Sequence, residues 1–129
     1  MAVTDFGCSE CRPSDAAAAW EAIIKIPINS RVIDESHFIV SIRECASCDQ
    51  NYLQITTETI DWEDGEDPVY RTVIPITDAE KHNLLDSNPV YEADLESIGT
   101  DRRSLKFDWP KGKPQNIYWG IGVTIGIHD

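Results

Sequence analysis

The four cysteines of this 129-residue chain occur in two pairs, and each pair has the spacing C-x-x-C. The pairs occupy residues 8 to 11 (CSEC) and 45 to 48 (CASC), and 33 residues, 12 to 44, separate them. Two residues between a pair of thiolates let both sulfur atoms reach one ion at about 2.3 Å, and two such turns complete a tetrahedron. The spacing predicts one structural Zn²⁺ per chain, with no open position for a substrate. The predicted ligands are Cys8, Cys11, Cys45 and Cys48.

Two other chemistries remain open for the cysteines. A thiol oxidoreductase needs only one C-x-x-C ahead of a helix that lowers a thiol pKa, and Cys8 with Cys11 precedes a predicted helix. A disulfide framework needs an oxidising compartment. The N-terminal segment MAVTDFGCSEC lacks the basic and apolar regions of a secretory signal, and no stretch approaches about 18 apolar residues. We therefore expect a cytoplasmic protein without membrane association, in which metal binding explains both pairs.

The first half of the chain contains one helical pattern and two strand patterns. Ser14 can cap a helix whose apolar residues recur at helical spacing up to Ile24, and Pro27 ends it. Residues 36 to 44 and 51 to 62 are rich in β-branched and aromatic side chains. These patterns predict two strands joined by a turn that contains the second cysteine pair.

The middle of the chain predicts a further strand followed by two helices. Residues 69 to 76 return as a strand, and residues 77 to 80 have the T-x-x-E spacing of a capping box, which opens a short helix through Leu85. Residues 89 to 98 fit either a helix or a strand. We favour the helix, because an Asn-Pro pair opens this segment and Gly99 closes it.

The last predicted hairpin consists of residues 104 to 109 and 116 to 127, on either side of the turn PKGKP. Six apolar residues alternate at period two from Ile117 to Ile127, which predicts a central core strand, and we expect other groups to pack closely on the glycines between them. The whole pattern predicts one α+β domain over residues 1 to 129. In it an antiparallel sheet is covered by two or three helices, and zinc joins the N-terminal segment to the first hairpin.

The second cysteine pair also carries a resemblance to a known group of proteins. The motif CASC leads a strand into TETIDWEDGEDP, and IPITDAE follows. With these motifs, residues 38 to 85 resemble uncharacterised bacterial zinc-ribbon-like proteins. The resemblance implies metal binding at Cys45 and Cys48 and implies no activity. Such ribbons favour glycine after the second cysteine of a pair, and here Arg12 and Asp49 stand at those positions.

The chain carries a large negative charge, with 23 acidic and 11 basic residues and a formal net charge of −12. A nucleic-acid-binding zinc ribbon is therefore disfavoured, because phosphate binding depends on Lys and Arg. Residues 58 to 67 (ETIDWEDGED) hold six carboxylates and no cation around Trp62. We expect this run to be the edge of a face that binds a basic protein. The alternative is a solvated hairpin tip. The carboxylates are Glu58, Asp61, Glu63, Asp64, Glu66 and Asp67.

No catalytic constellation can be assembled from the sequence. It contains no G-x-S-x-G elbow and no glycine-rich phosphate loop, and the carboxylate run lacks the spacing of a calcium loop. The enzymatic alternatives are a thiol oxidoreductase through Cys8 and Cys11 or a metal-assisted hydrolase through the carboxylates of residues 58 to 67. We favour a non-enzymatic, acidic zinc-binding protein that docks on or neutralises a basic partner, as an immunity or inhibitor protein does.

Overall fold

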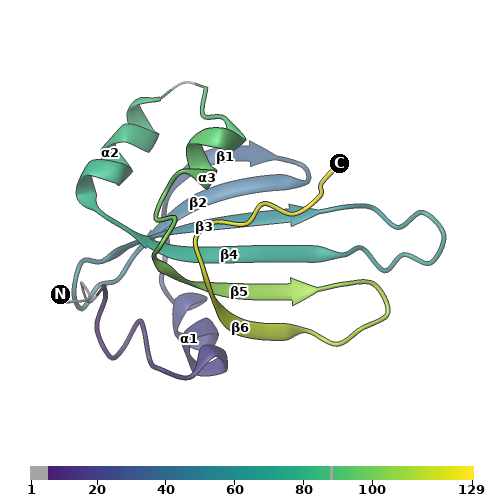
Figure 1. Ribbon diagram of the computed structural model, residues 1–129, viewed down its shortest axis with the longest axis horizontal. Helices are drawn as coiled ribbons and strands as arrows, with labels where there is room; N and C mark the ends of the chain where they lie inside the picture. Colours follow the sequence, from purple (N-terminus) through teal and green to yellow (C-terminus); the bar gives the residue numbers. More distant parts are fainter. Residues whose placement is uncertain (1–5, 88) are drawn as a thin grey trace.

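The computed structural model of the protein describes residues 6–87 and 89–129. Within them, six strands form one antiparallel sheet in the order β1-β2-β3-β4-β5-β6, and three helices accompany it (Figure 1). The α+β architecture with an antiparallel sheet is thus confirmed. The strands are β1 (Ile28–Glu35), β2 (Phe38–Glu44), β3 (Asn51–Glu58), β4 (Val69–Ile76), β5 (Arg103–Trp109) and β6 (Asn116–Ile121), and the helices are α1 (Ala16–Ile23), α2 (Asp78–Asp86) and α3 (Glu92–Glu96).

Both faces of the sheet are covered, and each has its own apolar cluster. On one face α1 packs against β5 and β6, where Ile23 is buried with Tyr52, Val73 and Leu105. On the other face lie α2, α3 and the C-terminal segment, which crosses the sheet after β6 (Figure 1). The cluster on this second face contains Phe38, Val40, Ile42, Leu53, Ile55, Ile74, Ile76, Leu84, Leu95 and Ile98.

The two strands predicted around the second cysteine pair are present as β2 and β3. They pair antiparallel with Glu44 opposite Asn51, so the connection between them is tight. The prediction missed β1, an edge strand whose residues are half-buried or exposed and whose register shifts twice. The cysteine turn therefore belongs to the second hairpin of the sheet, and not to the first. β3 ends at Glu58 instead of residue 62, because the chain there enters a loop organised by Asp61.

The cap of α1 differs from the prediction. Asp15, and not Ser14, is the N-cap residue, and its carboxylate accepts a hydrogen bond of 2.9 Å from the backbone N–H of Ala18. The carbonyl of Ser14 instead accepts a hydrogen bond of 2.8 Å from the indole of Trp119. This bond ties the segment before α1 to β6.

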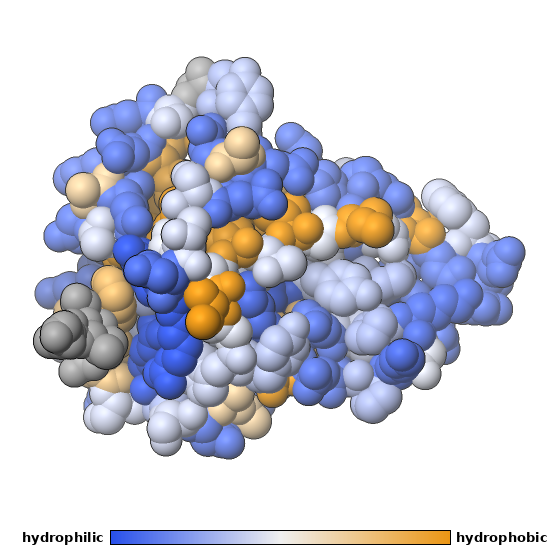
Figure 2. Space-filling view, in the orientation of Figure 1, coloured by the Kyte–Doolittle hydropathy of each residue, from blue (hydrophilic) through white to orange (hydrophobic). Residues whose placement is uncertain are grey.

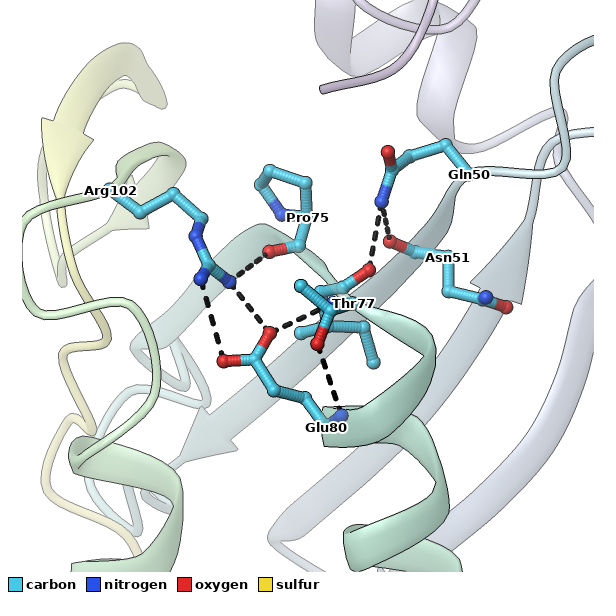
Figure 3. A network of polar contacts seen from close by, with 7 residues as sticks. Gln50, Asn51, Pro75, Thr77, Glu80 and Arg102 are labelled. Atoms are coloured by element: carbon cyan, nitrogen blue, oxygen red, sulfur yellow. Dashed lines mark hydrogen bonds and ion pairs between the residues drawn. The ribbon is translucent and has the colours of Figure 1, made fainter. Parts of the chain in front are cut away.

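The predicted capping box at the start of α2 is confirmed and belongs to a larger network (Figure 3). Thr77 Oγ1 accepts from the N–H of Glu80 at 3.1 Å, and Glu80 Oε1 accepts from the N–H of Thr77 at 2.8 Å. Arg102 donates to Glu80 and to the carbonyl of Pro75, both at 2.8 Å. Burial opposes ionisation of Glu80, but the hydrogen bonds from Arg102 and Thr77 outweigh it, so the pKa of Glu80 is lowered. The network fixes α2 to the turn before β5.

The helix predicted over residues 89 to 98 is present in a shorter form as α3, Glu92–Glu96. Its alternative, a strand, is not formed. Gly99 follows with a positive φ of 55°, a conformation that glycine adopts without strain, and it closes the segment as expected. Asn88, the other residue of the predicted cap pair, lies outside the described residues.

The prediction of a central core strand over residues 116 to 127 is wrong. β6 is an edge strand that ends at Ile121. Trp119 packs on the α1 face, whereas Val123 and Ile125 pack against the cluster on the opposite face. The change of face occurs at Gly122, where φ is +72° and the chain turns across the sheet. Alternation at period two keeps side chains on one face only while the chain remains a strand.

The glycines of this segment confirm the expected close packing at one position in particular. A Cβ atom on Gly120 would lie 2.9 Å from Cε of Lys106, so the missing side chain makes room for this lysine. Lys106 is buried, and its ammonium donates to the carbonyl of Gly122 at 2.9 Å and to Thr124 Oγ1 at 3.1 Å. Burial lowers the pKa of Lys106. The lysine thereby holds the C-terminal segment against the sheet.

The surface on the side of the C-terminal segment is mostly hydrophilic, with apolar side chains in a band across its middle (Figure 2). The loops at the right-hand end of this view are also largely hydrophilic (Figure 2). Among residues 6–87 and 89–129, no helix has the length and apolar character needed to cross a membrane.

Candidate metal centre

The four cysteine sulfur atoms converge, and all lie within 4.8 Å of one another. The Sγ–Sγ distances are 3.8 Å for Cys8 and Cys11, 3.9 Å for Cys8 and Cys45, and 3.8 Å for Cys11 and Cys48. Four sulfurs bound at about 2.3 Å around a tetrahedral ion lie about 3.8 Å apart, whereas a disulfide needs about 2.05 Å. All four cysteines are free. The arrangement could therefore bind a metal ion.

Each cysteine pair lies in a turn closed by the same kind of backbone hydrogen bond. The N–H of Arg12 donates to the carbonyl of Cys8 at 2.8 Å, and the N–H of Asp49 donates to the carbonyl of Cys45 at 2.9 Å. Asp49 has a φ of +64°, in the left-handed region that glycine usually occupies. Asp is one of the few other residues that visit this region, so the second turn keeps its geometry without glycine.

The two turns are brought together by contacts from both sides of the site. The N–H of Cys45 donates to the carbonyl of Gln50 at 2.9 Å, which closes the β2–β3 connection. Gln50 Oε1 accepts from the N–H of Gly7 at 3.1 Å, so the same residue also holds the N-terminal segment. After the first cysteine pair, the guanidinium of Arg12 donates a hydrogen bond of 2.8 Å to the carbonyl of Arg103, the first residue of β5. Residues on either side of the first pair are thus fixed to the β2–β3 connection and to β5 by contacts that do not involve the cysteines.

The four sulfurs have unequal surroundings. Cys11 and Cys45 are buried, Cys8 is half-buried and Cys48 is exposed. Backbone N–H groups of Cys11 and Glu10 that face the Cys8 sulfur lower its pKa to about 7, whereas burial raises the pKa of Cys11. The site therefore has a buried side and an open side.

The predicted partner-binding run contains one carboxylate with an unexpected role. The Asp61 side chain is only 9% exposed, and it accepts hydrogen bonds from the backbone N–H groups of Glu63, Asp64 and Glu66 at 3.2 to 3.3 Å. Lys111, from the β5–β6 loop, lies 3.0 Å from it. The bond from Lys111 and these N–H groups lower the pKa of Asp61. Asp61 therefore does not fit the alternative of a solvated hairpin tip, because backbone N–H groups and Lys111 surround its carboxylate.

The rest of the run divides into paired and unpaired members. A carboxylate oxygen of Asp64 lies 2.8 Å from the ammonium of Lys111. Glu58, the last residue of β3, has a carboxylate oxygen 3.2 Å from the imidazole of His37. In the part of the chain that the structure describes, the side chains of Glu63 and Glu66 make no ion pair. Trp62 is 86% exposed among the exposed carboxylates Glu63, Asp64, Glu66 and Asp67. A groove of about 510 Å³ is lined by residues of this loop and of the β5–β6 loop.

Sequence reasoning missed two residues that shape these sites. The hydroxyl of Tyr52 lies 2.9 Å from the Cys11 sulfur. Lys111 lies outside the acidic run and forms ion pairs with two of its carboxylates. Tyr52 stands four residues after Cys48 on a strand, which is a weak signal that it lies near the site. Nothing in the sequence indicates that Lys111 and Asp61 meet, because two separate strand pairings place their loops together.

Comparison of the chain with protein-family models, with curated proteins and with solved structures finds no match. The resemblance of residues 38 to 85 to zinc-ribbon-like proteins therefore remains an interpretation of the motif.

Proposed function

We propose that the four cysteines bind one structural Zn²⁺ in a zinc-ribbon-like centre that joins the N-terminal segment to the β2–β3 turn. The observation that carries this proposal is the convergence of the four sulfurs within 4.8 Å, with three of the six Sγ–Sγ distances at 3.8 to 3.9 Å, the spacing around a tetrahedral ion. Thiolates favour soft ions such as Zn²⁺ over hard ions such as Mg²⁺ and Ca²⁺, and a tetrahedral set of four sulfurs fits zinc. In the reducing cytoplasm, where we place the protein, they stay free to bind it. With four protein ligands the ion has no position for a substrate, so its role is structural.

For the chain as a whole, we propose a non-enzymatic acidic binding protein that docks on or neutralises a basic protein, in the manner of an immunity or inhibitor protein. The support comes from the β3–β4 loop. Trp62 is 86% exposed, and large aromatic side chains are the type that anchors interfaces. Around it, Glu63 and Glu66 make no ion pair within the described residues, in a chain of formal net charge −12. A basic surface offers the complementary charge.

The order of this loop supports the same proposal. Asp61 accepts three backbone hydrogen bonds within the loop, and Lys111 links Asp61 and Asp64 to the β5–β6 loop. A loop that is ordered before binding loses less conformational entropy when the partner arrives. Asp61 and Asp64 thus hold the shape of the face, and Asp67 accepts a hydrogen bond of 2.8 Å from the backbone N–H of Asp61. Trp62, Glu63 and Glu66 are the side chains that we propose contact the partner.

The other classes have less support. For a thiol oxidoreductase, a helix N-terminus should lie close to the reactive thiol, but α1 begins only at Ala16, after its cap Asp15. For a hydrolase, the least exposed carboxylate of the run, Asp61, is already engaged by backbone N–H groups and Lys111. For a nucleic-acid-binding ribbon, the negative charge is unfavourable.

The test is to identify the partner by pull-down from the native cell and then to measure association kinetics with purified proteins. The variant Glu63→Gln/Glu66→Gln removes two charges from the proposed face without touching Asp61 or Lys111. Its matched control is Asp86→Asn/Glu96→Gln, which removes two exposed charges on α2 and α3. We expect the first variant to associate more slowly and with a weaker salt dependence, and the control to behave as wild type. Equal association rates and salt dependences for both variants would place the binding face elsewhere.

A further inference from the structure

The metal centre has one close neighbour that is not a cysteine. The hydroxyl of Tyr52 lies 2.9 Å from the sulfur of Cys11, across 41 positions of the chain. Both residues are 2% exposed, so no bulk water separates or replaces this contact. Tyr52 stands on β3, in the cluster of the α1 face, and its ring is held there by Ile23, Val73 and Leu105.

The direction of this hydrogen bond follows from the chemistry of a metal-bound thiolate. Such a sulfur carries negative charge and no proton, so it can only accept. The phenol hydroxyl therefore donates. Hydrogen bonds to a charged acceptor are roughly twice as strong as bonds between neutral groups. Cys11 also accepts from the backbone N–H of Cys8 at 3.3 Å, so its sulfur receives two donors.

The chain leaves room for this contact at Gly7. A Cβ atom on Gly7 would lie 2.3 Å from the hydroxyl oxygen of Tyr52 and 2.9 Å from the sulfur of Cys11. Gly7 also has a φ of +76°, which strains any residue with a side chain. The absence of a side chain at this position keeps the space between hydroxyl and sulfur clear.

Apart from the other thiols, the support on the opposite side of the centre comes, in the described residues, from the backbone alone, where the N–H of Gln50 faces the Cys48 sulfur. Cys48 is exposed, and its side chain contacts the sulfur of Cys11 at 3.8 Å but no hydroxyl or side-chain amide in the described residues. Metal sites are tuned by the groups that hydrogen-bond to their ligands, and the loss of one such group costs about 10- to 100-fold in metal affinity.

We propose that Tyr52 is a positioning residue of the metal centre, whose hydroxyl orients the Cys11 thiolate and withdraws negative charge from it. This inference rests on the proposed zinc site. Its consequence is an asymmetric centre, in which Cys11 is the last ligand to leave the ion and Cys48 is the first. The open side formed by Cys48 is then the point at which chelators and thiol reagents enter.

The test uses Tyr52→Phe, which keeps the buried ring and removes only the hydroxyl. Its matched control is Tyr70→Phe, because Tyr70 lies on β4 away from the cysteines and its hydroxyl makes no hydrogen bond in the described residues. We expect the Tyr52→Phe variant to bind Zn²⁺ about 10- to 100-fold more weakly in competition with a chelator. With Co²⁺ in place of zinc, its sulfur-to-cobalt absorption band should move to lower energy, because the unassisted thiolate gives up an electron more easily.

The outcomes separate the two proposals. If the wild-type protein fails to bind Co²⁺ or Zn²⁺, the proposed metal site is wrong. If wild type and Tyr52→Phe bind equally tightly with the same absorption band, the site stands and the role of Tyr52 is overturned. A second measurement uses the wild-type protein alone. Under slow removal of zinc by a chelator, iodoacetamide should label Cys48 first and Cys11 last, and early labelling of Cys11 would also contradict the inference.

Discussion

Cys8 and Cys45 are 37 positions apart in the chain, and their sulfur atoms lie 3.9 Å from each other. One of them precedes α1 and the other follows β2, so the contact closes a long loop that contains a helix and two strands. Closing a loop of this length costs conformational entropy, which a bound ion can offset. The stability of the N-terminal part of the molecule should therefore depend on the metal.

The variant Cys45→Ser tests this dependence. It removes one of the four proposed ligands, and the free energy of binding a structural Zn²⁺, about 10–16 kcal/mol in small zinc domains, is also free energy of folding. We expect the variant to lose the metal and to melt far below wild type in thermal unfolding followed by circular dichroism. Ala46→Ser, at an exposed position in the same turn, is the control and should melt as wild type. An unchanged melting temperature for the Cys45→Ser variant would indicate that the cysteines have no structural role.

The β3–β4 loop gives a prediction about hydrogen exchange. Asp61→Ala should abolish the protection of the backbone N–H groups of Glu63, Asp64 and Glu66, because the variant removes their acceptor. Glu63→Gln, which leaves Asp61 in place, should retain the protection. Protected amides in the Asp61→Ala variant would show that the loop is held by other contacts.

The same loop has a predictable pH dependence. Lys111 and the backbone N–H groups lower the folded-state pKa of Asp61. The stabilisation it provides is therefore fully present above the unfolded value of about 3.9, and it is lost as the pH falls through the lower folded value. After correction for intrinsic exchange rates, the protection of these amides should be the same at pH 7 and at pH 5.

The packing of β6 can be tested by comparing two alanine variants. Leu53 is fully buried on β3, so Leu53→Ala should lower the free energy of unfolding by about 2–5 kcal/mol. Ile121 ends the edge strand β6 and is 67% exposed, so Ile121→Ala should change the free energy of unfolding by no more than about 0.5 kcal/mol. Chemical denaturation measures both. A similar cost for the two variants would mean that β6 is buried in solution.

The sequence contained enough information for the parts of the fold that depend on local chemistry. The C-x-x-C spacing brings each pair of thiolates together, and the T-x-x-E spacing at Thr77 and Glu80 forms a capping box, because both patterns act within a few residues. The alternation after Ile117 was equally clear but misleading. A single positive φ at Gly122 moves Val123 and Ile125 to the other face, and alternation of apolar residues does not reveal such a turn.

The partners of the predicted sites could not be found in the same way. Tyr52 reaches Cys11 across 41 positions, and Lys111 reaches Asp61 across two strand pairings. Such contacts depend on the register of the whole sheet. The sequence therefore indicated the four cysteines that converge and the location of the acidic loop, but it did not predict the residues that hold either of them in shape.

The most direct test of this account is the metal content of the protein purified under reducing conditions, together with a titration of its free thiols. We predict one zinc per chain by elemental analysis. We also predict that the four thiols become reactive only when a strong chelator removes the ion, since all four are ligands. Protein without zinc, in which Cys8, Cys11, Cys45 and Cys48 all react at once while the fold persists, would contradict the central claim.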